Sequence, residues 1–416
     1  MAKFWFVSAP LFGHLDWGGF LKTALTLQSA GHQVTWISQP AIGAYLAEKG
    51  LEFSPIATTG WLWPPPPHPH PKSLTPQQAV FIRYKRALDT WLSEELIPAA
   101  VQHLLDLAET NGVPDVLVTD PFLTASAIAA EKMGTTLAVC GWPATTDLDE
   151  DHLFAVQREL AEDSRGRIQR LCQQFNVRGE NFSQGPTPSI QSPHLHISYF
   201  NDYWHQGDPP FLPQTHFVGG TTDIPTTPPP QWMEHVPDAP IALITLGSVF
   251  TGDLGFFAWA AQAAHRLDWV PVVVIGRNPI APEEKAQLKA ALPPGTFLLN
   301  WVDYDHIFPR LKVIVHHGGM GTTHAAILHG VPQVVVPHAA DQRGQAKRVS
   351  QAKVGLHLTA HEVKNGHLLP AIRAVGTDEK VRQQCQWLAK RFAALGGAAQ
   401  AGNLLVGLVN ESGIGS

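Results

Sequence analysis

The chain has 416 residues, of which 44% are hydrophobic and 15% charged, and its formal net charge is −6. This length predicts roughly two or three domains, and the hydrophobic content is enough to bury large cores, which excludes a disordered chain. The negative charge offers no general attraction to nucleic acid or to an anionic membrane. Any phosphate group that the protein binds must therefore be held by local geometry.

Targeting and redox signals are weak in this chain. Cys140, Cys172 and Cys385 are few, odd in number and widely spaced, which argues against a disulfide scaffold or a cysteine metal site and favours a reducing compartment. The apolar N-terminus is interrupted by Pro10 and Gly13, so a core strand is expected rather than a signal peptide. No run approaches the roughly 20 apolar residues of a membrane span. We expect a soluble, cytoplasmic protein without stable membrane insertion.

Short apolar runs alternate with amphipathic stretches through the first half, a rhythm typical of βαβ units and a parallel sheet. The predicted strands are 4–9, 34–38, 116–119, 137–140 and 195–198. The predicted helices between them include 18–30, 76–92 and 125–133.

This rhythm stops between residues 219 and 240, where the chain is rich in Pro, Gly and Thr and has the composition of a linker. It then restarts, with predicted strands at 241–246, 270–275, 297–299, 313–316 and 334–336. We therefore expect an α/β protein with two Rossmann-like domains, 1–218 and 241–395, whose parallel sheets face each other across a cleft. Residues 396–416 are expected to form a helix that packs back on the N-terminal domain. In such folds ligands bind at the carboxyl edges of the strands.

A glycine-rich turn, HGGMGTT at 317–323, directly follows the predicted strand 313–316 and opens a helix. The N–H groups at the positive end of a helix suit a diphosphate, and the glycines allow it to approach closely. Thr322 and Thr323 can donate hydroxyl hydrogen bonds. An ordinary tight turn between strand and helix has the same glycines, so this pattern alone is a weak signal.

The residues around this turn resemble the nucleotide-sugar signature of the UDP-glycosyltransferase family, the inverting, metal-independent glycosyltransferases of family 1 with the GT-B fold. The similarity begins at Trp301-Val302, runs through VIVHHGGMGTTHAAILHGVPQVVVP at 313–337 and ends at Asp341-Gln342. It extends more loosely over the chain, including Gly13-His14 and Leu246-Gly247-Ser248. The run HHGGMGTTHAA is closer to the antibiotic-, sterol- and carotenoid-glycosylating members than to plant enzymes.

The resemblance implies a nucleotide-sugar site in the second half, made of Gly247, Ser248, Trp301, Val302, His317, Gly319, Gly321, Thr322, Asp341 and Gln342. Trp301 would stack on the nucleobase, and the backbone of the next residue would pair with its edge. His317, Thr322 and the surrounding N–H groups would hold the diphosphate. Asp341-Gln342 would hydrogen-bond the sugar hydroxyls. The alternatives are a core position for Trp301 and a plain helix start at Asp341-Gln342.

Two departures from the family pattern concern the donor. Ala325 stands eight positions after His317, where many members carry a glutamate that grips the ribose hydroxyls. Asp303-Tyr304 replaces the Pro-Gln that commonly follows the tryptophan pair. Both departures leave uridine and thymidine donors open. We expect no cofactor, with a UDP-sugar as donor co-substrate.

Glycosyl transfer to a hydroxyl needs a base that removes the proton as the oxygen attacks the anomeric carbon. Imidazole, with an ordinary pKa of about 6.5, suits this task, above all when a carboxylate fixes its tautomer. His14 stands out among the 21 histidines because it follows the first strand in a Pro/Gly turn. The resemblance places the carboxylate at the end of a later strand, where Asp120 follows 116–119, whereas Asp115 should lie at the opposite edge. The alternative for Asp120 is an N-cap of the next helix.

No metal site is expected. The run Asp147-Leu148-Asp149 looks like the Asp-x-Asp metal motif of the other large glycosyltransferase fold, but it lies in the acidic stretch DLDEDH. It is therefore interpreted as a solvated face at the start of a polar helical segment. His68 and His70 have no further ligands at suitable spacing.

Aromatic residues of the first half are the acceptor candidates, namely Trp17, Trp61, Trp63, Phe122 and Trp142. Four prolines follow Trp63, and a stiff loop with aromatic side chains favours an apolar, ring-containing acceptor. Phe81, Tyr84 and Trp91 recur at helical spacing and are expected mostly to pack.

The leading hypothesis is an inverting glycosyltransferase that moves a hexose from UDP-glucose to a hydroxyl of an apolar small molecule, with His14 as base and Asp120 as its partner. A TDP-sugar-dependent transferase and a sugar-nucleotide epimerase are alternatives within the same fold. A catalytically silent protein that binds sugar nucleotides or lipophiles is the alternative of a different class.

Overall fold

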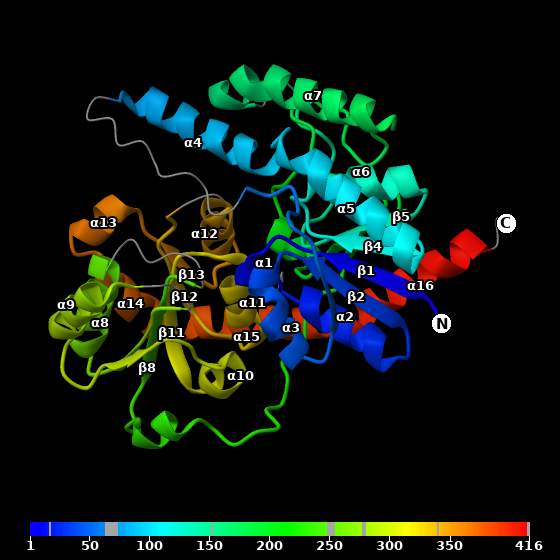
Figure 1. Ribbon diagram of the computed structural model, residues 1–416. Helices are drawn as coiled ribbons and strands as arrows, with labels where there is room; N and C mark the ends of the chain where they lie inside the picture. The colour runs from blue at the N-terminus through cyan, green and yellow to red at the C-terminus, as the bar shows by residue number, and fades with distance from the viewer. Residues whose placement is uncertain are drawn as a thin grey trace. The chain divides into compact units, whose positions relative to one another are not determined.

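The structure is a computed structural model that describes residues 1–15, 18–62, 74–149, 151, 153–247, 254–276, 280–338 and 341–413. The chain forms two compact α/β units (Figure 1). Unit 1 consists of Met1–Tyr199, Gly207–Val218 and Ala398–Ser416. Unit 2 consists of Phe200–Gln206 and Gly219–Gly397.

Unit 1 is built on a seven-stranded parallel sheet with the order β3-β2-β1-β4-β5-β6-β7. Its strands are β1 (Lys3–Val7), β2 (Gln33–Ser38), β3 (Glu52–Pro55), β4 (Val116–Thr119), β5 (Thr136–Cys140), β6 (Leu195–Ser198) and β7 (Thr215–Phe217). The central strands β1 and β4 are apolar on both faces because helices cover both sides. On one face Phe6 packs against Phe20 of α2, with ring centroids 5.2 Å apart, and on the other Trp5 joins the core beneath α5 and α6.

Eight helices of unit 1 surround this sheet within the described residues. They are α1 (Phe12–Leu15), α2 (Phe20–Ser29), α3 (Gly43–Glu48), α4 (Pro76–Trp91), α5 (Leu96–Asn111), α6 (Thr124–Met133), α7 (Ala155–Phe175) and α16 (Gly397–Gly413). Helices α4 and α7 lie side by side (Figure 1). Gly402 of α16 faces Thr26 and Leu27 of α2, so the C-terminal helix packs within unit 1.

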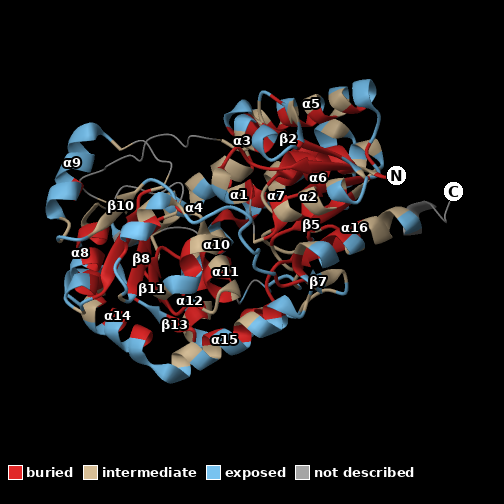
Figure 2. Ribbon diagram, turned by 90° about the horizontal axis from the view of Figure 1, so that it is seen from below, coloured by how far each residue is buried: buried red, intermediate tan, exposed pale blue. Residues whose placement is uncertain are grey.

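Unit 2 contains a six-stranded parallel sheet with the order β10-β9-β8-β11-β12-β13. Its strands are β8 (Ile241–Thr245), β9 (Val270–Val274), β10 (Phe297–Leu299), β11 (Leu311–His316), β12 (Gln333–Val335) and β13 (Gly355–His357). Its helices are α8 (Leu254–His265), α9 (Pro282–Ala291), α10 (Tyr304–Ile307), α11 (Met320–Leu328), α12 (Gln342–Gln351), α13 (Ala360–Lys364), α14 (Leu368–Thr377) and α15 (Glu379–Ala393). Figure 2 shows that the strands of both units are buried, while the outer faces of the helices are exposed.

The predicted strands are confirmed, and 116–119, 195–198 and 297–299 have the observed bounds. Three short strands, β3, β7 and β13, were not predicted because they are polar or partly exposed and join the sheet at or near its edges. The predicted linker contains a 3-10 helix, Gln231–His235, whose Met233 is buried. A helix start at Asp147-Leu148-Asp149 is wrong, since α7 begins only at Ala155.

One stretch, residues 379–410, has an 18-residue window with a mean hydropathy of 1.5, and 28% of that window is buried. By length and composition alone it is able to cross a membrane, which the expectation of no span-length run overlooked. The stretch is divided, because α15 ends at Ala393 and α16 begins at Gly397. Gly396 and Gly397, with φ of 88° and 56°, make the turn between them.

Candidate active site

His14 and Asp120 form a hydrogen-bonded pair in unit 1, with His14 Nδ1 3.1 Å from Asp120 Oδ2. Strands β1 and β4 are neighbours in register, Val7 opposite Thr119, so the segments that follow the two strands meet at the same edge. His14 lies on the one-turn helix α1 rather than in the predicted open turn. Its side chain is 15% exposed, whereas Asp120 is fully buried.

The carboxylate of Asp120 is held by its surroundings. Oδ2 also accepts the Ala9 N–H at 3.2 Å, and Oδ1 accepts the Phe122 N–H at 2.9 Å. The alternative of an N-cap is wrong, because the residue that caps α6 is Leu123. Asp115 accepts the Lys3 N–H at the start of β1 and so lies at the opposite edge, as predicted. A carboxylate facing Nδ1 favours the tautomer with the proton on Nδ1, which makes Nε2 the basic nitrogen of His14.

A chain of aromatic rings continues from His14. The His14 ring lies 5.4 Å from Trp61, Trp61 lies 5.6 Å from Phe122, and Phe122 lies 5.1 Å from Trp142, all edge to face. Three predicted acceptor residues are therefore brought together beside the histidine. The other two, Trp17 and Trp63, lie outside the described residues.

A cavity of about 440 Å³ in unit 1 adjoins this chain. Phe122 connects the two, because it contacts His14 with centroids 5.9 Å apart and also lines the cavity. Most of the other lining residues are apolar or aromatic, and they include Tyr84, Leu88 and Trp91 of α4, Trp142, Pro143, Leu160 of α7 and Ile190. Tyr84 and Trp91 were expected mostly to pack, but one side of each faces this cavity. The polar residues of the lining are Thr145, Asp147, Gln157, Ser164, Thr187, Ser189, Gln191 and His196.

His196, on β6, supports Trp142 and was missed by the sequence analysis. It is 3% exposed, its Nε2 accepts the Ser192 N–H at 2.9 Å, and its Nδ1 lies 3.2 Å from the Trp142 carbonyl oxygen. The two contacts require the neutral Nδ1–H tautomer, which donates to Trp142. Burial lowers the pKa of His196 to about 4, in agreement with a neutral ring. No local sequence signal distinguishes it among the histidines.

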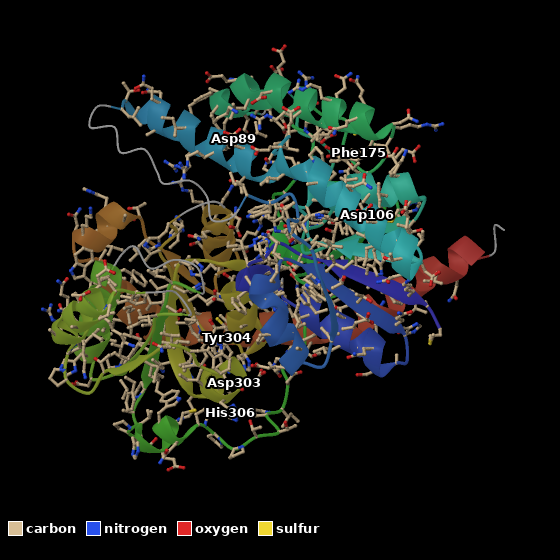
Figure 3. All side chains as sticks on the ribbon, viewed as in Figure 1. Asp89, Asp106, Phe175, Asp303, Tyr304 and His306 are labelled. Carbon is tan, nitrogen blue, oxygen red and sulfur yellow. The ribbon has the colours of Figure 1, made fainter. Side chains whose placement is uncertain are left out.

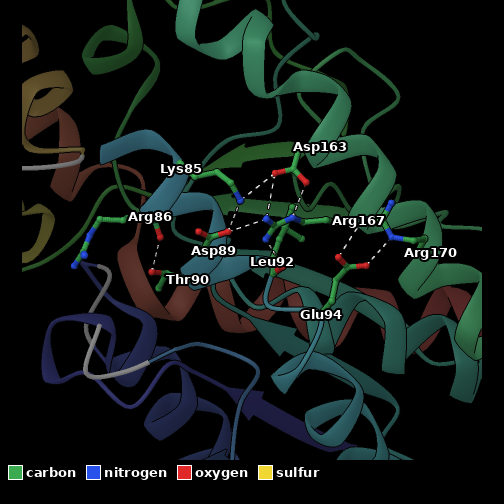
Figure 4. Close-up of polar contacts among 9 residues, drawn as sticks. All are labelled: Lys85, Arg86, Asp89, Thr90, Leu92, Glu94, Asp163, Arg167 and Arg170. Atoms are coloured by element: carbon green, nitrogen blue, oxygen red, sulfur yellow. Dashed lines mark hydrogen bonds and ion pairs between the residues drawn. The ribbon is translucent and has the colours of Figure 1, made fainter. Parts of the chain in front are cut away.

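Helices α4 and α7, which line the cavity, are joined by a charged network (Figure 4). Arg167 contacts Asp89 at 2.7 Å, Asp163 at 2.9 Å and the Leu92 carbonyl at 3.1 Å, and Lys85 lies 2.7 Å from Asp89 and 3.2 Å from Asp163. The Arg167 side chain is 12% exposed, and its hydrogen bond lowers the pKa of Asp163. The network fixes the spacing of the two helices on which Trp91 and Leu160 stand.

In unit 2 the glycine-rich turn follows His316, whose ring is held by a hydrogen bond at each nitrogen. His316, the last residue of β11, is fully buried; its Nδ1 accepts the Gly318 N–H at 3.1 Å, so its Nε2–H donates to Gln333 Oε1 at 3.0 Å. Burial lowers the pKa of His316 to about 4. Gly318 has a φ of 89°, and a Cβ there would lie 2.8 Å from Val335 Cγ1. This position therefore requires glycine.

The His317 ring fits between two glycines. A Cβ at Gly247, where φ is 77°, would lie 2.6 Å from His317 Cε1, and a Cβ at Gly319 would overlap Nε2 of the same ring. The ring is 9% exposed, and burial, followed by His316 and His338, lowers the pKa of His317 to about 3. His317 is therefore a neutral group within the glycine-rich turn. Two of the predicted phosphate-site glycines are needed for packing against this ring as well as for ligand approach.

Of the remaining predicted donor residues, Ser248 lies outside the described residues. Helix α11 begins just after Gly319, whose N-cap position offers no side-chain hydrogen bond, and Gly321 is in its first turn. Thr322 is 7% exposed. A helix start of this kind presents N–H groups to an anion.

The nucleobase candidate is an exposed ring. Trp301 is 59% exposed, so the alternative that it belongs to the core is wrong, whereas the neighbouring Val302 is 3% exposed. Asp341 precedes α12 but makes no side-chain capping bond, and Gln342 Oε1 accepts the His338 N–H at 2.9 Å. The pair therefore does start a helix, as the alternative has it, although the Asp341 side chain does not cap that helix.

Among the described residues, no group of three or more His, Cys, Asp or Glu side chains is arranged to hold a metal ion. Asp147 and Asp149 are exposed. His68 and His70 lie outside the part of the chain that the structure describes.

The sequence of this chain is similar to those of known glycosyltransferases. The family described as erythromycin biosynthesis protein CIII-like, C-terminal domain, matches residues 268–400. The chain is 22% identical to NDP-glycosyltransferase YjiC of Bacillus subtilis over 98% of this chain and 97% of that protein. It is 25% identical to demethyllactenocin mycarosyltransferase of Streptomyces fradiae over 52% of this chain, where the match spans only 46% of that relative.

Solved structures share the fold. The glycotransferase of kitacinnamycin superposes with a TM-score of 0.74 at 23% identity, covering 98% of this chain and 99% of that one. The spinosyn rhamnosyltransferase SpnG, solved with thymidine diphosphate, superposes with a TM-score of 0.71 at 18% identity, covering 97% and 99%. The predicted GT-B fold is therefore confirmed. In agreement with these relatives, the chain is a glycosyltransferase that takes a nucleotide sugar as donor, and it is similar to the bacterial antibiotic-glycosylating members of family 1.

Proposed function

We propose that this glycosyltransferase moves a hexose, with inversion, from a nucleoside diphosphate sugar to a hydroxyl of an apolar, ring-containing small molecule. UDP-glucose is the first candidate donor. The observation that carries the proposal is the His14–Asp120 pair, 3.1 Å apart, at the end of an aromatic chain that leads into an apolar cavity. In this proposal residues 1–218 bind the acceptor and 241–395 bind the donor, in a cytoplasmic enzyme.

His14 is the general base in this mechanism. Its Nε2 takes the proton of the acceptor hydroxyl while the oxygen forms a bond to the anomeric carbon. The bond between that carbon and the diphosphate oxygen breaks, and the nucleoside diphosphate leaves with the electron pair. Asp120 stabilises the imidazolium that forms, because its carboxylate is already hydrogen-bonded to Nδ1.

The donor site stabilises the leaving group without a charged side chain at the turn. Trp301 offers an exposed ring for stacking on the nucleobase. The start of α11 directs its N–H groups and positive dipole end at the diphosphate, and the neutral His317 can donate one further hydrogen bond. Asp341 and Gln342 bind the hexose hydroxyls. Preorganised dipoles of this kind act on the charge that develops as the bond breaks.

The cavity of unit 1 suits a lipophilic acceptor. Its volume of about 440 Å³ lies in the range of small-molecule pockets, and its lining is largely aromatic and aliphatic. Trp61, Phe122 and Trp142 would form the wall that positions an acceptor ring with one hydroxyl near His14. Sterol, carotenoid, polyketide and phenolic acceptors all have this character.

A thymidine diphosphate sugar is the second candidate donor. Ala325 offers a methyl group where a carboxylate would bind the two hydroxyls of ribose, so nothing at this position favours ribose over 2′-deoxyribose. Solved structures with this fold include transferases complexed with thymidine diphosphate.

The test is a donor and acceptor panel with the whole protein. UDP-glucose and TDP-glucose are each incubated with hydroxylated polyketides, sterols, carotenoids and phenols, and released nucleoside diphosphate and product mass are measured. Release coupled to a product heavier by one hexosyl group, with an inverted anomeric centre, supports the proposal. Binding of nucleotide without consumption of donor, with any acceptor, would favour a silent binding protein instead. Conversion of the free sugar nucleotide without an acceptor would favour an epimerase.

A further inference from the structure

Residues 200–206 follow strand β6 of unit 1 in the chain but belong to unit 2. They contain one turn of 3-10 helix, Asp202–His205, and the Asn201 side chain that precedes it accepts the backbone N–H of Trp204 at 2.9 Å. The turn buries Trp204, which is 1% exposed, and its ring stacks on Phe200 with centroids 5.4 Å apart. The indole is therefore held both at its backbone and on one face of its ring.

The one polar atom of this side chain is directed at helix α12. Trp204 Nε1 donates to Oε1 of Gln345 at 3.0 Å, and Gln345 is itself only 3% exposed. A buried indole N–H and a buried amide oxygen have little access to water, so each needs the other as its partner. Gln345 lies in the first turn of α12, and its backbone N–H donates to the carbonyl oxygen of Asp341 at 3.1 Å. Two hydrogen bonds therefore lead from Trp204 to the residue that precedes α12.

The start of α12 is also in contact with the glycine-rich turn, since a Cβ at Gly318 would lie 3.0 Å from the Gln342 carbonyl oxygen. Asp341 and Gln342 are the pair that would bind the hexose hydroxyls, and such hydrogen bonds weaken steeply when distance and angle are lost. We propose that Trp204 is a positioning residue of the sugar site, which acts through Gln345 to hold the start of α12 in place for the hexose of the donor. This inference rests on the proposed function.

The part of the donor site that would bind the nucleotide has anchors of its own. His316 accepts a backbone N–H of the glycine-rich turn at 3.1 Å. Helix α10, which begins three residues after Trp301, is held by its own side chains, with Asp303 Oδ2 3.1 Å from His306 Nδ1 (Figure 3). Neither of these two contacts involves Trp204. Loss of the indole N–H should therefore weaken binding of the hexose and spare binding of the nucleoside diphosphate.

The experiment is calorimetry without an acceptor. Wild type and Trp204→Phe are titrated with UDP and UDP-glucose, and likewise with TDP and TDP-glucose, so that either nucleotide serves. Phenylalanine keeps an aromatic ring for contact with Phe200 but has no N–H group. Trp204→Phe should bind the nucleotide sugar about three- to tenfold more weakly, as expected for one hydrogen bond, and the free nucleoside diphosphate within about twofold of wild type.

Two further variants separate the hydrogen bond from the packing of the segment. Gln345→Met removes the same bond from the other side and should show the same selective loss, and the double variant should lose no more than Gln345→Met alone. Trp387→Phe is the matched control, because it removes an indole N–H from α15 whose ring contacts Tyr203, with centroids 4.9 Å apart. Trp387 is 40% exposed, and both affinities of this variant should equal those of wild type.

Equal losses for the nucleoside diphosphate and the nucleotide sugar in Trp204→Phe would mean that the indole only supports the fold, and no loss with either would also overturn the inference. Losses that add in the double variant would contradict action through Gln345. Wild type that binds neither the nucleoside diphosphates nor their sugars would overturn the proposed donor site itself, and the inference with it.

Discussion

The pairing of Asp120 with His14 gives the sharpest prediction, tested by Asp120→Asn. The carboxylate accepts three hydrogen bonds, from His14 Nδ1 and from the N–H groups of Ala9 and Phe122. An amide of the same shape has only one oxygen, so at least one donor must face its NH₂ group. If the amide nitrogen faces His14, it donates to Nδ1 and moves the imidazole proton to Nε2, which removes the basic nitrogen from the acceptor side.

The expected loss follows from the size of general-base catalysis, which contributes about 10²- to 10⁴-fold to a rate. Asp120→Asn should therefore lower kcat at least about 100-fold, measured at saturating donor and acceptor. UDP affinity should stay within about twofold of wild type, since the residue lies in unit 1 and the donor residues lie in unit 2. The buried site should also lose roughly 1–3 kcal/mol of unfolding free energy, so a urea titration accompanies the assay.

Two comparisons separate catalysis from folding in that experiment. Asp115→Asn changes an aspartate at the other end of the same strand, whose carboxylate accepts the Lys3 N–H, and should keep kcat within about twofold. Combining Asp120→Asn with His14→Ala should lower kcat no further than His14→Ala alone, because the two groups act as one unit. Activity of Asp120→Asn within threefold of wild type would refute the role of the carboxylate. Multiplying losses in the double variant would refute its action through the histidine.

Three further outcomes follow from the same geometry. His14→Ala should abolish transfer to hydroxyl acceptors and leave UDP affinity nearly unchanged; a strong loss of UDP binding would mean that the base is assigned to the wrong residue. Gly319→Ala places a methyl group against the His317 ring and should weaken UDP binding at least about tenfold in calorimetry, while Gly407→Ala, at a glycine with open space around it, should not. His196, His316 and His317 have folded pKa values of about 4, 4 and 3, below their ordinary 6.5, so the unfolded chain takes up protons first as the pH falls. Their contribution to the free energy of unfolding is complete above about pH 6.5 and is lost towards pH 4. At pH 5 the loss is about 2 kcal/mol for each histidine, which urea unfolding at pH 7 and pH 5 will measure.

The strands were predictable where a local run of apolar residues marks them. Residues 116–119 and 297–299 are short apolar runs between polar or glycine-containing segments. Strand 116–119 is fully buried, as expected in a parallel sheet covered on both faces, whereas 297–299 is partly buried at the sheet edge. The polar strand β13 has no such signal, because two of its three residues are exposed and only the neighbouring β12 defines it. Strand order itself is not readable from these runs, since it depends on where each crossover returns.

The site residues were predictable where they belong to a known sequence motif. They were not predictable where their role depends on contacts with residues far away in the sequence. Trp301 and His317 stand in a recognisable stretch of sequence, and in the structure Trp301 is exposed while His317 is 9% exposed, just before helix α11. His196 holds the Trp142 carbonyl from 54 positions away, and Arg167 reaches Asp89 from 78 positions away. Contacts of this range follow from the tertiary fold alone. The aromatic side chains on α4 show the same limit, because helical spacing does not tell a core face from a cavity wall.

Both units place their chemistry at the same point of the topology, although no residue-level repeat relates them. In unit 1 the chain runs from β1 outward through β2 and β3 and then returns to β4 on the other side of β1. Unit 2 repeats this course, from β8 through β9 and β10 and back to β11. The crossovers leave such central strand pairs in opposite directions, which opens a crevice at their carboxyl ends. His14 and Asp120 follow β1 and β4, and Gly247 and His317 follow β8 and β11, so each contact that matters joins segments brought together by this reversal. The His14–Asp120 pair and the glycine-rich turn at His317 therefore arise from the same feature of the topology. A change that shifts the register between the two central strands of a unit should disrupt its site before it disrupts its core.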